Sequence, residues 1–411
     1  MGYRELIKIY YESIDAYRAM YESRYSSPDT VKLSFKIKDN QAFFIQNSEM
    51  AEVAFKILKA DKNICVLCGE LPRIAIDQFK RRCLIDEIMI TNKIEGVYST
   101  RREIASILSE LETTVKEKRK KRRFWGLVEQ YLKLLSNERI SLQTCEEIRE
   151  LYDELVLAEV IEEDSSNAPD GELFRKDSTS VYNASEKEIH RGSYPEAVIR
   201  KEMEKALALL NNEEVFYIYR IAAFHYLFGY IHPFYDGNGR LGRFIVSAML
   251  IKELHPLLSS RISYTIAENI RDYYDAFETC NEPRNLGDVT PFVIMMLNMI
   301  KTSIEQLEEA LKKRHTSLNY YTESISKLPG GSNGRTRKMY SFLIQAGLFS
   351  ESGVSTRVLE YNMKNSYTTV KKELDFISSN SLLIRTRVGK ENLYMIDIEK
   401  LDKYLREITV M

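Results

Sequence analysis

Apolar residues along most of this chain recur every three or four positions, which is the spacing of a helix with a buried face. One segment shows the spacing at Met203, Ala206, Leu207 and Leu210. The next segment repeats it at Val215, Ile218, Ile221, Ala222 and His225. Glycine and proline, which interrupt helices, number only 17 and 9 in 411 residues. The pattern therefore predicts a mainly α-helical protein.

Two interruptions of this periodicity suggest how the chain is divided. Residues 164–183 begin with turn formers and continue with residues that favour strands, so we expect a short β-hairpin or flap over Leu173–Tyr182. Residues 328–334 have the glycine-rich, polar composition of a flexible linker. We therefore expect an N-terminal helical region of unclear role at 1–90, a central domain at 91–327 and a C-terminal domain at 328–411.

The C-terminal segment changes style after the linker. Its pattern predicts helices at about 335–346, 355–363 and 366–378, followed by a strand, a glycine-containing turn and a second strand. This order is similar to a winged helix-turn-helix, an α+β module. Residues 366–376 would then be the recognition helix, with candidate contacts at Tyr367, Thr368, Thr369, Lys371 and Lys372. Contact with DNA and contact with a protein remain equally good interpretations.

Charge and cysteine content narrow the class of protein further. Lys plus Arg total 59 against 60 for Asp plus Glu, so overall charge favours neither a nucleic-acid nor a membrane partner. The five cysteines are few and odd in number, which favours reduced thiols. Cys65 and Cys68 form a CxxC in an apolar stretch, and we expect buried structural thiols there. With a charged N-terminus and no apolar run of membrane-spanning length, we expect a cytoplasmic protein.

The most specific chemistry lies at residues 232–243, His-Pro-Phe-Tyr-Asp-Gly-Asn-Gly-Arg-Leu-Gly-Arg. Glycines allow backbone N–H groups to approach oxygen atoms, and arginines donate paired hydrogen bonds to phosphate. A carboxylate can hold a divalent cation, and a histidine can transfer a proton. The composition therefore predicts a polyphosphate-binding loop. Residues 237–242 also match the GxGxxG pattern of dinucleotide-binding folds, but the preceding segment has helical rather than strand periodicity, which excludes that interpretation.

The whole run resembles the signature of the Fic family, His-Pro-Phe-x-Asp-Gly-Asn-Gly-Arg-x-x-Arg, with every defining position occupied. Weaker resemblance extends from about residue 91 to residue 300, including 171–175, 271–277 and 287–292. It implies a Fic-type helical bundle with a short β-hairpin flap. It also implies transfer of AMP from ATP to a Ser, Thr or Tyr hydroxyl of a protein substrate, with release of pyrophosphate.

The resemblance also assigns expected roles to individual residues. His232 would accept the proton of the attacking hydroxyl, and Asp236 would hold Mg²⁺ between the α- and β-phosphates. The nucleotide-binding residues would be Gly237, Asn238, Gly239, Arg240, Gly242 and Arg243, with Arg240 on the α/β-phosphates and Arg243 on the γ-phosphate. Tyr273 and Tyr274 are candidate adenine contacts. Leu173, Phe174 and Arg175 are the candidate flap residues that dock an extended target segment.

A second motif, Thr91-Asn92-Lys93-Ile94-Glu95-Gly96, matches the inhibitory [Ser/Thr]-x-x-x-Glu-[Gly/Asn] pattern of part of this family. Thr91 and Glu95 are four residues apart, so one helical face presents both. The resemblance implies an inhibitory helix at about 91–100, in which Glu95 forms a salt bridge with Arg243 and competes with the γ-phosphate. We therefore expect an autoinhibited adenylyltransferase.

Other functions remain open at this stage. The same site could use another nucleotide donor or remove AMP from a modified protein, and the C-terminal module at 328–411 could make the protein a DNA-binding regulator. The resemblance further implies self-modification, and a homodimer, because family members with this layout often self-associate. We expect no membrane partner.

Overall fold

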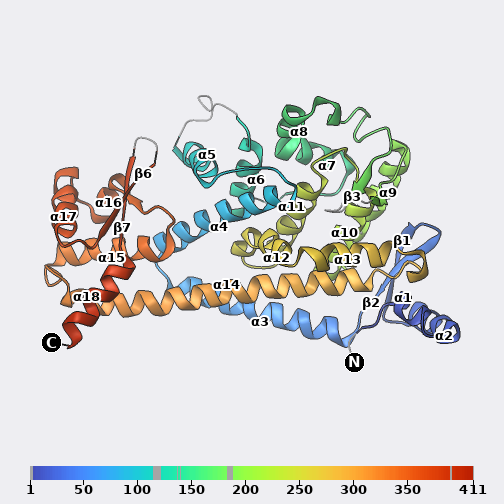
Figure 1. Ribbon diagram of the computed structural model, residues 1–411, viewed down its shortest axis with the longest axis horizontal. Coiled ribbons are helices and arrows are strands. Elements are labelled where there is room, and N and C mark those ends of the chain that lie inside the picture. Colours follow the sequence, from blue (N-terminus) through green and yellow to red (C-terminus); the bar gives the residue numbers. More distant parts are fainter. Residues whose placement is uncertain are drawn as a thin grey trace. The chain divides into compact units, whose positions relative to one another are not determined.

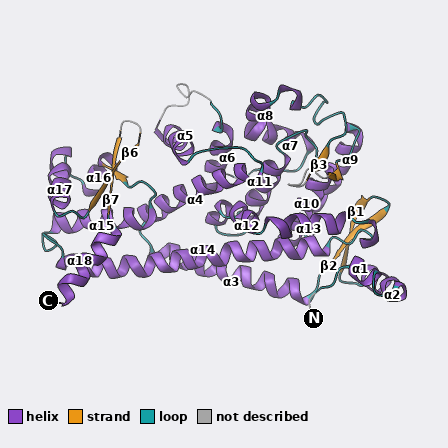
Figure 2. Cartoon of the chain, in the orientation of Figure 1, coloured by secondary structure: helices purple, strands orange, loops and turns teal. Residues whose placement is uncertain are grey.

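The computed structural model describes residues 3–113, 122–136, 138, 140–182, 188–388 and 391–410. The fold is mainly helical, as predicted, and its strands form small sheets of two or three members (Figure 2). The chain divides into two compact units. The first comprises residues up to 61, 87–100 and 107–305, and the second comprises 62–86, 101–106 and 306–411. These bounds do not coincide with the boundaries expected at residues 90 and 327.

The first unit contains most of the elements labelled in Figure 1. Its N-terminal part has helices α1 and α2 and an antiparallel β1–β2 hairpin, at Leu6–Tyr10, Ile14–Tyr25, Thr30–Ile37 and Asn40–Ile45. Next come α6, α7, the π-helical stretch η2 and α8, at Trp125–Leu135, Cys145–Tyr152, Asp153–Leu157 and Ala158–Glu163. Strands β3 and β4 and helices α9 to α13 follow, at Ser180–Tyr182, Glu188–Arg191, Glu196–Leu210, Tyr217–Ile231, Asn238–Leu250, Ile262–Glu268 and Ile270–Asn281. Short 3-10 turns lie at Ser165–Asn167, Pro256–Ser260 and Pro283–Asn285.

Four longer helices contribute residues to both units: α3, α4, α5 and α14, at Ser48–Glu70, Arg73–Ile94, Arg101–Thr113 and Thr290–Ser324. Helices α10 and α11 form the core of the first unit, because almost every side chain on both is buried. A helix buried on nearly all sides packs against other elements all round. The loop that joins these two helices, residues 232–237, is thus held at both ends by the most rigid part of the unit.

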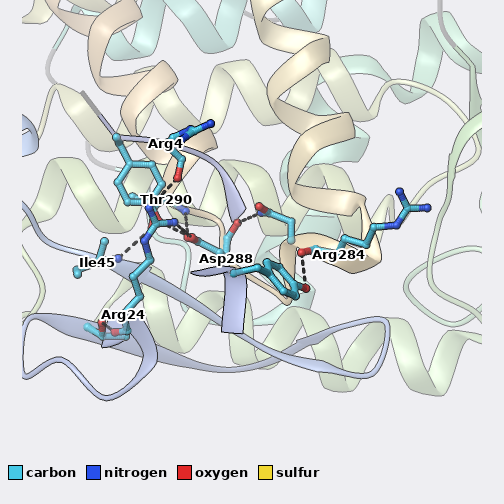
Figure 3. Close-up of polar contacts among 10 residues, drawn as sticks. Arg4, Arg24, Ile45, Arg284, Asp288 and Thr290 are labelled. Atoms are coloured by element: carbon cyan, nitrogen blue, oxygen red, sulfur yellow. Dashed lines mark hydrogen bonds and ion pairs between the residues drawn. The ribbon is translucent and has the colours of Figure 1, made fainter. Parts of the chain in front are cut away.

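A buried polar cluster around Asp288 fixes the N-terminal part of the chain (Figure 3). The Asp288 carboxylate pairs with the Arg24 guanidinium at 3.2 Å and accepts hydrogen bonds from the Tyr3 hydroxyl and from the backbone N–H of Thr290. The Thr290 hydroxyl in turn accepts from the backbone N–H of Ile45 in β2, at 3.0 Å. The N-terminal region of previously unclear role is therefore tied to the segment that precedes α14.

Replacing Asp288 with asparagine is expected to destabilise the protein by about 3–5 kcal/mol, because it leaves the Arg24 charge buried without a counter-ion. Both side chains are buried. The free energy of unfolding in denaturant measures this loss. The matched control is Glu12→Gln, which breaks an exposed pair with Arg4 and should cost about 1 kcal/mol or less. Equal losses in the two variants would contradict the role given to Asp288.

The predicted hairpin at Leu173–Tyr182 is wrong in its position. The pairing strands are β3 and β4, with Ser180 opposite Arg191 and Val181 opposite His190. Residues 171–179 form bends rather than a strand. The reason is that the Glu196 carboxylate accepts hydrogen bonds from the backbone N–H groups of residues 172, 173 and 174, at 3.0, 2.7 and 2.9 Å. Donors held by a side chain are not available to a strand partner.

The C-terminal part of the second unit contains the helices and strands expected there. Helices α15, α16 and α17 lie at Gly334–Phe349, Thr356–Met363 and Tyr367–Ser379, after a 3-10 turn at Ile325–Lys327. Strands β5, β6 and β7 lie at Val354–Ser355, Leu383–Val388 and Glu391–Ile396, and helix α18 at Ile398–Val410. The three strands form an antiparallel sheet in the order β5-β7-β6. Buried Leu343, Leu359, Val370, Leu374 and Leu401 show that these helices share an apolar core.

The expectation of buried thiols at the CxxC is wrong. Ile64 lies on the buried side of α3, but Cys65 is one position further, about 100° around the helix, and is exposed. Cys68 is half-exposed. No disulfide joins any of the five cysteines, all of which lie in described parts of the chain. Among the described residues, no helix combines the length and apolarity needed to cross a bilayer.

Candidate active site

The candidate loop reverses the chain between α10 and α11. His232 follows the last residue of α10 with a left-handed backbone, φ 50°, and its N–H donates to the Phe228 carbonyl at 2.9 Å. Gly237 precedes α11, also left-handed, with φ 82°. A Cβ at Gly237 would lie only 2.9 Å from a methyl carbon of Val156, so glycine is required both for conformation and for space. The sequence correctly predicted a histidine at the end of one helix and a glycine turn before the next.

Contacts within the loop hold it in one shape. The Asn238 side chain accepts from the Phe234 N–H at 3.0 Å and donates to the Phe234 carbonyl at 2.8 Å. Phe234 is fully buried and stacks on Tyr152, with ring centroids 3.6 Å apart. The buried Asn238 side chain therefore holds the loop closed. The backbone of the loop, rather than this side chain, is left to contact a ligand.

Arg175 supports the loop from outside and is not a docking residue. Its side chain is fully buried, and its guanidinium donates to the carbonyls of His232, Ser193 and Asp177, at 2.9 Å for His232 and 2.7 Å for Ser193. Phe174 is also fully buried, against Phe234. Neither of these two side chains offers a surface to a target, whereas Leu173 is partly exposed, so side-chain docking by Phe174 and Arg175 does not fit the structure. The reversed chain leaves carbonyls at the end of α10 without helical partners, and Arg175 satisfies them.

The environment of His232 keeps its imidazole neutral. Burial, and then the positive charge of Arg175 and the neighbouring His190, lower the pKa of His232 to about 3. The ring also hydrogen-bonds to the Gly229 backbone. A carbonyl can only accept, so that ring nitrogen carries the proton and the other has a free lone pair. The second ring nitrogen of His232 is thus unprotonated at physiological pH.

Arg243 is fully engaged by residues of the second motif. Its Nη1 pairs with the Glu95 carboxylate at 2.7 Å. Its Nε donates to the Thr91 hydroxyl at 2.9 Å, and its Nη2 donates to the Thr91 carbonyl at 3.0 Å. The Glu95 carboxylate also lies directly against Gly239, because a Cβ placed there would collide with it. All three guanidinium nitrogens are therefore occupied, and a carboxylate covers the first turn of α11.

The side chain of Arg240 contacts a different set of residues from that of Arg243, although the two residues are only one helical turn apart in α11. It is fully buried, and its Nη1 pairs with the Glu159 carboxylate of α8 at 3.1 Å. Its Nη2 is 3.6 Å from the Asp236 carboxylate, and its Nε and Nη2 have no hydrogen-bond partner among the described residues. Buried N–H groups without acceptors are costly, so this geometry fits an anion that would fill them.

A small cavity brings eight of the predicted site residues together. Its lining includes Glu95, His232, Asn238, Gly239, Gly242, Arg243, Tyr273 and Tyr274. Gly237, Asp236 and Arg240 do not line it. Its volume is about 110 Å³, well below the roughly 300–1,000 Å³ of small-molecule sites. The Glu95 carboxylate is part of the lining of this small cavity.

His190 and Asn281 are among the cavity residues that sequence reasoning missed. His190 lies on β4, and its Nε2 hydrogen-bonds to the Tyr230 carbonyl at 2.6 Å. No local motif surrounds it, so its strand pairing alone brings it to the site. His225 is a buried core histidine as expected, bound to the Tyr273 hydroxyl at 2.8 Å. Burial, followed by the charge of Arg243, lowers the pKa of His225 to about 3.

Comparison with known proteins agrees with this geometry. The Fic/DOC family model matches residues 143–250. A protein adenylyltransferase Fic from Nematostella vectensis is 33% identical over 81 residues, 20% of this chain and 17% of that protein. The protein adenylyltransferase fic-1 of Caenorhabditis elegans is 27% identical over 190 residues, 45% of this chain and 34% of that protein. The matches thus span about a third or less of these relatives' lengths.

A solved structure extends the likeness in fold. The crystal structure of a Fic family protein from Desulfovibrio desulfuricans G20 superposes with a TM-score of 0.51 and 19% identity, covering 85% of this chain and 96% of that one. The two chains thus share a fold over most of their lengths. Residues 143–250 of this chain are a Fic/DOC family domain, and the resemblance predicted from the loop is confirmed.

Proposed function

We propose that this protein is an adenylyltransferase that transfers AMP from ATP to a hydroxyl side chain of a protein and is held inactive by Glu95. The observation that carries the proposal is the contact between Glu95 and Arg243, which joins the two sequence motifs at 2.7 Å. The names of the relatives support the reaction class, since those proteins are called adenylyltransferases.

The reaction would proceed by in-line displacement. The target hydroxyl oxygen bonds to the α-phosphorus, the bond from that phosphorus to the oxygen bridging to the β-phosphate breaks, and pyrophosphate leaves. The hydroxyl proton passes to the unprotonated nitrogen of His232. Backbone N–H groups at the start of α11 would bind phosphate oxygens, because the first N–H groups of a helix lack internal partners and carry the positive end of its dipole.

The residues near Asp236 suit a nucleotide accompanied by Mg²⁺. Asp236 is partly exposed at the start of the glycine turn, and Arg240 has two unfilled N–H groups beside it. The described residues include no cluster of three or more His, Cys, Asp or Glu side chains that could hold a metal. A single carboxylate is nevertheless sufficient when substrate phosphates complete the coordination. Bound there, Mg²⁺ would neutralise charge on the α- and β-phosphates.

Glu95 would inhibit the reaction by competing with the γ-phosphate for Arg243. Thr91 and Glu95 engage three of the five N–H donors of the Arg243 guanidinium, and the Glu95 carboxylate takes the paired position that the γ-phosphate would need. The Glu95 carboxylate also fills space over Gly239 that a phosphate would need. Since phosphoryl-transfer catalysis depends largely on positioning, displaced or excluded phosphates stop the reaction.

The β3–β4 hairpin is the element that we propose for target docking, in place of residues 173–175. An extended target segment could pair with its edge as an added strand. His190 on β4 lines the same cavity as His232, so a segment bound there would lie near the base. Self-modification would follow when the segment belongs to another copy of the chain, as in a homodimer.

Labelled nucleotides test the reaction on the Glu95→Gly variant. ATP labelled at the α-phosphate should leave label on the protein, whereas ATP labelled at the γ-phosphate should not. Label from the γ-position alone would instead mean phosphorylation and overturn the proposal. Parallel reactions with GTP, UTP and CTP test for another donor. Release of AMP from modified protein by the wild type, lost in the variant, would indicate removal of AMP by the same site.

A second candidate function is DNA binding by the C-terminal part, proposed as a winged helix-turn-helix. The helices α16 and α17 are joined by a short turn at Lys364, and Tyr367, Thr368, Lys371 and Lys372 of α17 are exposed. Arg385 and Arg387 on β6 are exposed as well. Basic residues on a helix and on an adjacent sheet are typical of such modules on DNA.

Duplex DNA should therefore bind the full chain in a salt-dependent manner, because phosphate contacts release counterions. The double variant Lys371→Glu/Lys372→Glu should lose this binding. The matched control Lys400→Glu/Lys403→Glu on α18 should keep it, because those lysines pair with Asp397 and Glu407. Fluorescence anisotropy at several salt concentrations measures the affinities. No binding by the wild type at low salt would leave protein contact as the function of this module.

A further inference from the structure

A layer formed by α7, η2 and α8 supports the phosphate loop from behind. Tyr152 stacks flat on Phe234, and Val156 lies against Gly237. Glu159 reaches Arg240. The π-helical stretch at Asp153–Leu157 interrupts the regular turn between these positions. Such stretches are rare and occur frequently at functional sites. The layer thus places three side chains, spaced about one helical turn apart, against the loop and Arg240.

The contact between Glu159 and Arg240 is a buried ion pair that the proposed reaction does not itself explain. The side chains are 5% and 0% exposed, and the Glu159 oxygen is 3.1 Å from Arg240 Nη1. Only this nitrogen of the guanidinium is hydrogen-bonded, whereas Nε and Nη2 have no hydrogen-bond acceptor among the described residues. The buried hydroxyl of Tyr152 also has no hydrogen-bond partner in the described part of the chain. Glu159 therefore fixes one end of the guanidinium and leaves its other donors unfilled.

We propose that Glu159 is a positioning residue for nucleotide binding: its carboxylate holds Arg240 by Nη1 so that Nε and Nη2 remain available to phosphate oxygens. This inference rests on the proposed function, in which Arg240 binds the α/β-phosphate region. The arrangement differs from that of Arg243, whose three nitrogens are all engaged. Glu95 thus blocks Arg243, whereas Glu159 aligns Arg240.

The geometry explains why a carboxylate is needed at this position. A guanidinium is a planar fork, so fixing one nitrogen by a charge-assisted hydrogen bond also fixes the direction of the others. Without Glu159, Arg240 would be a buried cation free to turn toward Asp236, 3.6 Å away. Small errors in phosphate position cost much of the rate and affinity of transfer.

The charge of Glu159 makes this alignment sensitive to pH. Burial raises the pKa of Glu159 to about 7, against the opposing influence of Arg240. The Phe124 backbone, Arg123 and the neighbouring Glu163 also face it. The carboxylate is ionised above this pH and protonated below it, so the ion pair with Arg240 weakens as the pH falls from about 8 to about 6.

The experiment measures KM for ATP and kcat in the Glu95→Gly parent, alone and combined with substitutions on α8. Glu159→Ala should raise KM about tenfold, the effect of losing about 1.4 kcal/mol of binding free energy. Glu159→Gln keeps an acceptor oxygen without the charge, so its KM should fall between those of the alanine variant and the parent. The matched control is Glu162→Ala, which removes an exposed carboxylate of the same helix and should leave KM unchanged.

The pH dependence distinguishes positioning from simple support of the fold. The KM of the parent should approach that of Glu159→Gln as the pH falls from about 8 to about 6, because protonation removes the same charge. The inference would be overturned if the ratio of KM between Glu159→Gln and the parent did not change with pH. It would also be overturned if Glu159→Ala bound ATP like the parent. If Glu159→Ala does not fold, the glutamine variant and its pH dependence decide alone.

Failure of the inference and failure of the proposed function remain distinguishable. A parent that transfers no label from any nucleotide would refute the proposed function. Calorimetric titration of the same variants with ATP would then still report the affinity without any turnover. Unchanged ATP affinity in Glu159→Ala and Glu159→Gln would overturn the positioning role, and weakened affinity would support it.

Discussion

Replacing Glu95 with glycine is expected to raise the rate of AMP transfer about 10- to 100-fold. The estimate comes from the ion pair with Arg243, since a hydrogen bond to a charged group contributes about 1.5–3 kcal/mol. Arg243 is almost fully buried and Glu95 is three-quarters buried, so solvent screens the pair only weakly. The substitution also removes the carboxylate that lies against Gly239. Transfer of α-labelled AMP to the protein itself measures the rate.

Two further variants distinguish the effect of losing the carboxylate from the effect of disturbing the helix. Lys93→Gly introduces the same flexible residue at an exposed position of α4, two residues from Glu95, and should not activate the protein. Glu95→Gln keeps the shape but weakens the contact with Arg243, and its rate should be intermediate. An unchanged rate in Glu95→Gly, or equal activation by Lys93→Gly, would contradict inhibition by Glu95.

Replacing His232 with alanine in the Glu95→Gly background is expected to lower kcat by about 10²- to 10⁴-fold, the usual contribution of a positioned general base. No other described titratable side chain of the cavity combines a neutral, unprotonated nitrogen with a position at the start of the loop. His225 is bound to Tyr273, and His190 to the Tyr230 carbonyl. Single-turnover measurements with saturating ATP give the chemical rate directly.

The affinity for ATP provides the control for this variant. Backbone contacts of residue 232 with Arg175 and Phe228 hold this end of the loop, and alanine retains them, losing only the bond from the ring to the Gly229 backbone. ATP should therefore bind His232→Ala as tightly as the parent in calorimetry. A variant that still transfers AMP at the parental rate would exclude His232 as the base, and one that loses ATP binding would give it a different role.

The parts of the site that the sequence predicted are those encoded by short, continuous motifs. The run from His232 to Arg243 contains the cap of one helix, a glycine turn and the start of the next, so local conformational rules determine its shape. Thr91 lies in the last turn of α4 and Glu95 follows the end of this helix at Ile94, so the inhibitory helix expected at about 91–100 stops earlier, although both residues still contact Arg243. Their contact with Arg243, about 150 residues away, was predicted only from family resemblance.

The parts that the sequence did not predict depend on pairings between distant residues. Glu159 and Arg240 are 81 residues apart, and Arg175 and His232 are 57 apart. No periodicity marks such partners. The residues near 173 favoured strand locally, but the carboxylate of Glu196 holds their N–H groups, so the hairpin forms further along at β3 and β4. Tertiary contacts here override local preference.

The central claim is that Glu95 holds a competent adenylyltransferase inactive, and mass spectrometry of the intact Glu95→Gly protein tests it most directly. After incubation with ATP and Mg²⁺, the account predicts a protein heavier by one AMP less water, with the adduct on a Ser, Thr or Tyr hydroxyl. The wild type and the Glu95→Gly/His232→Ala double variant should show little or none. A Glu95→Gly protein of unchanged mass, under conditions in which it binds ATP, would contradict the account.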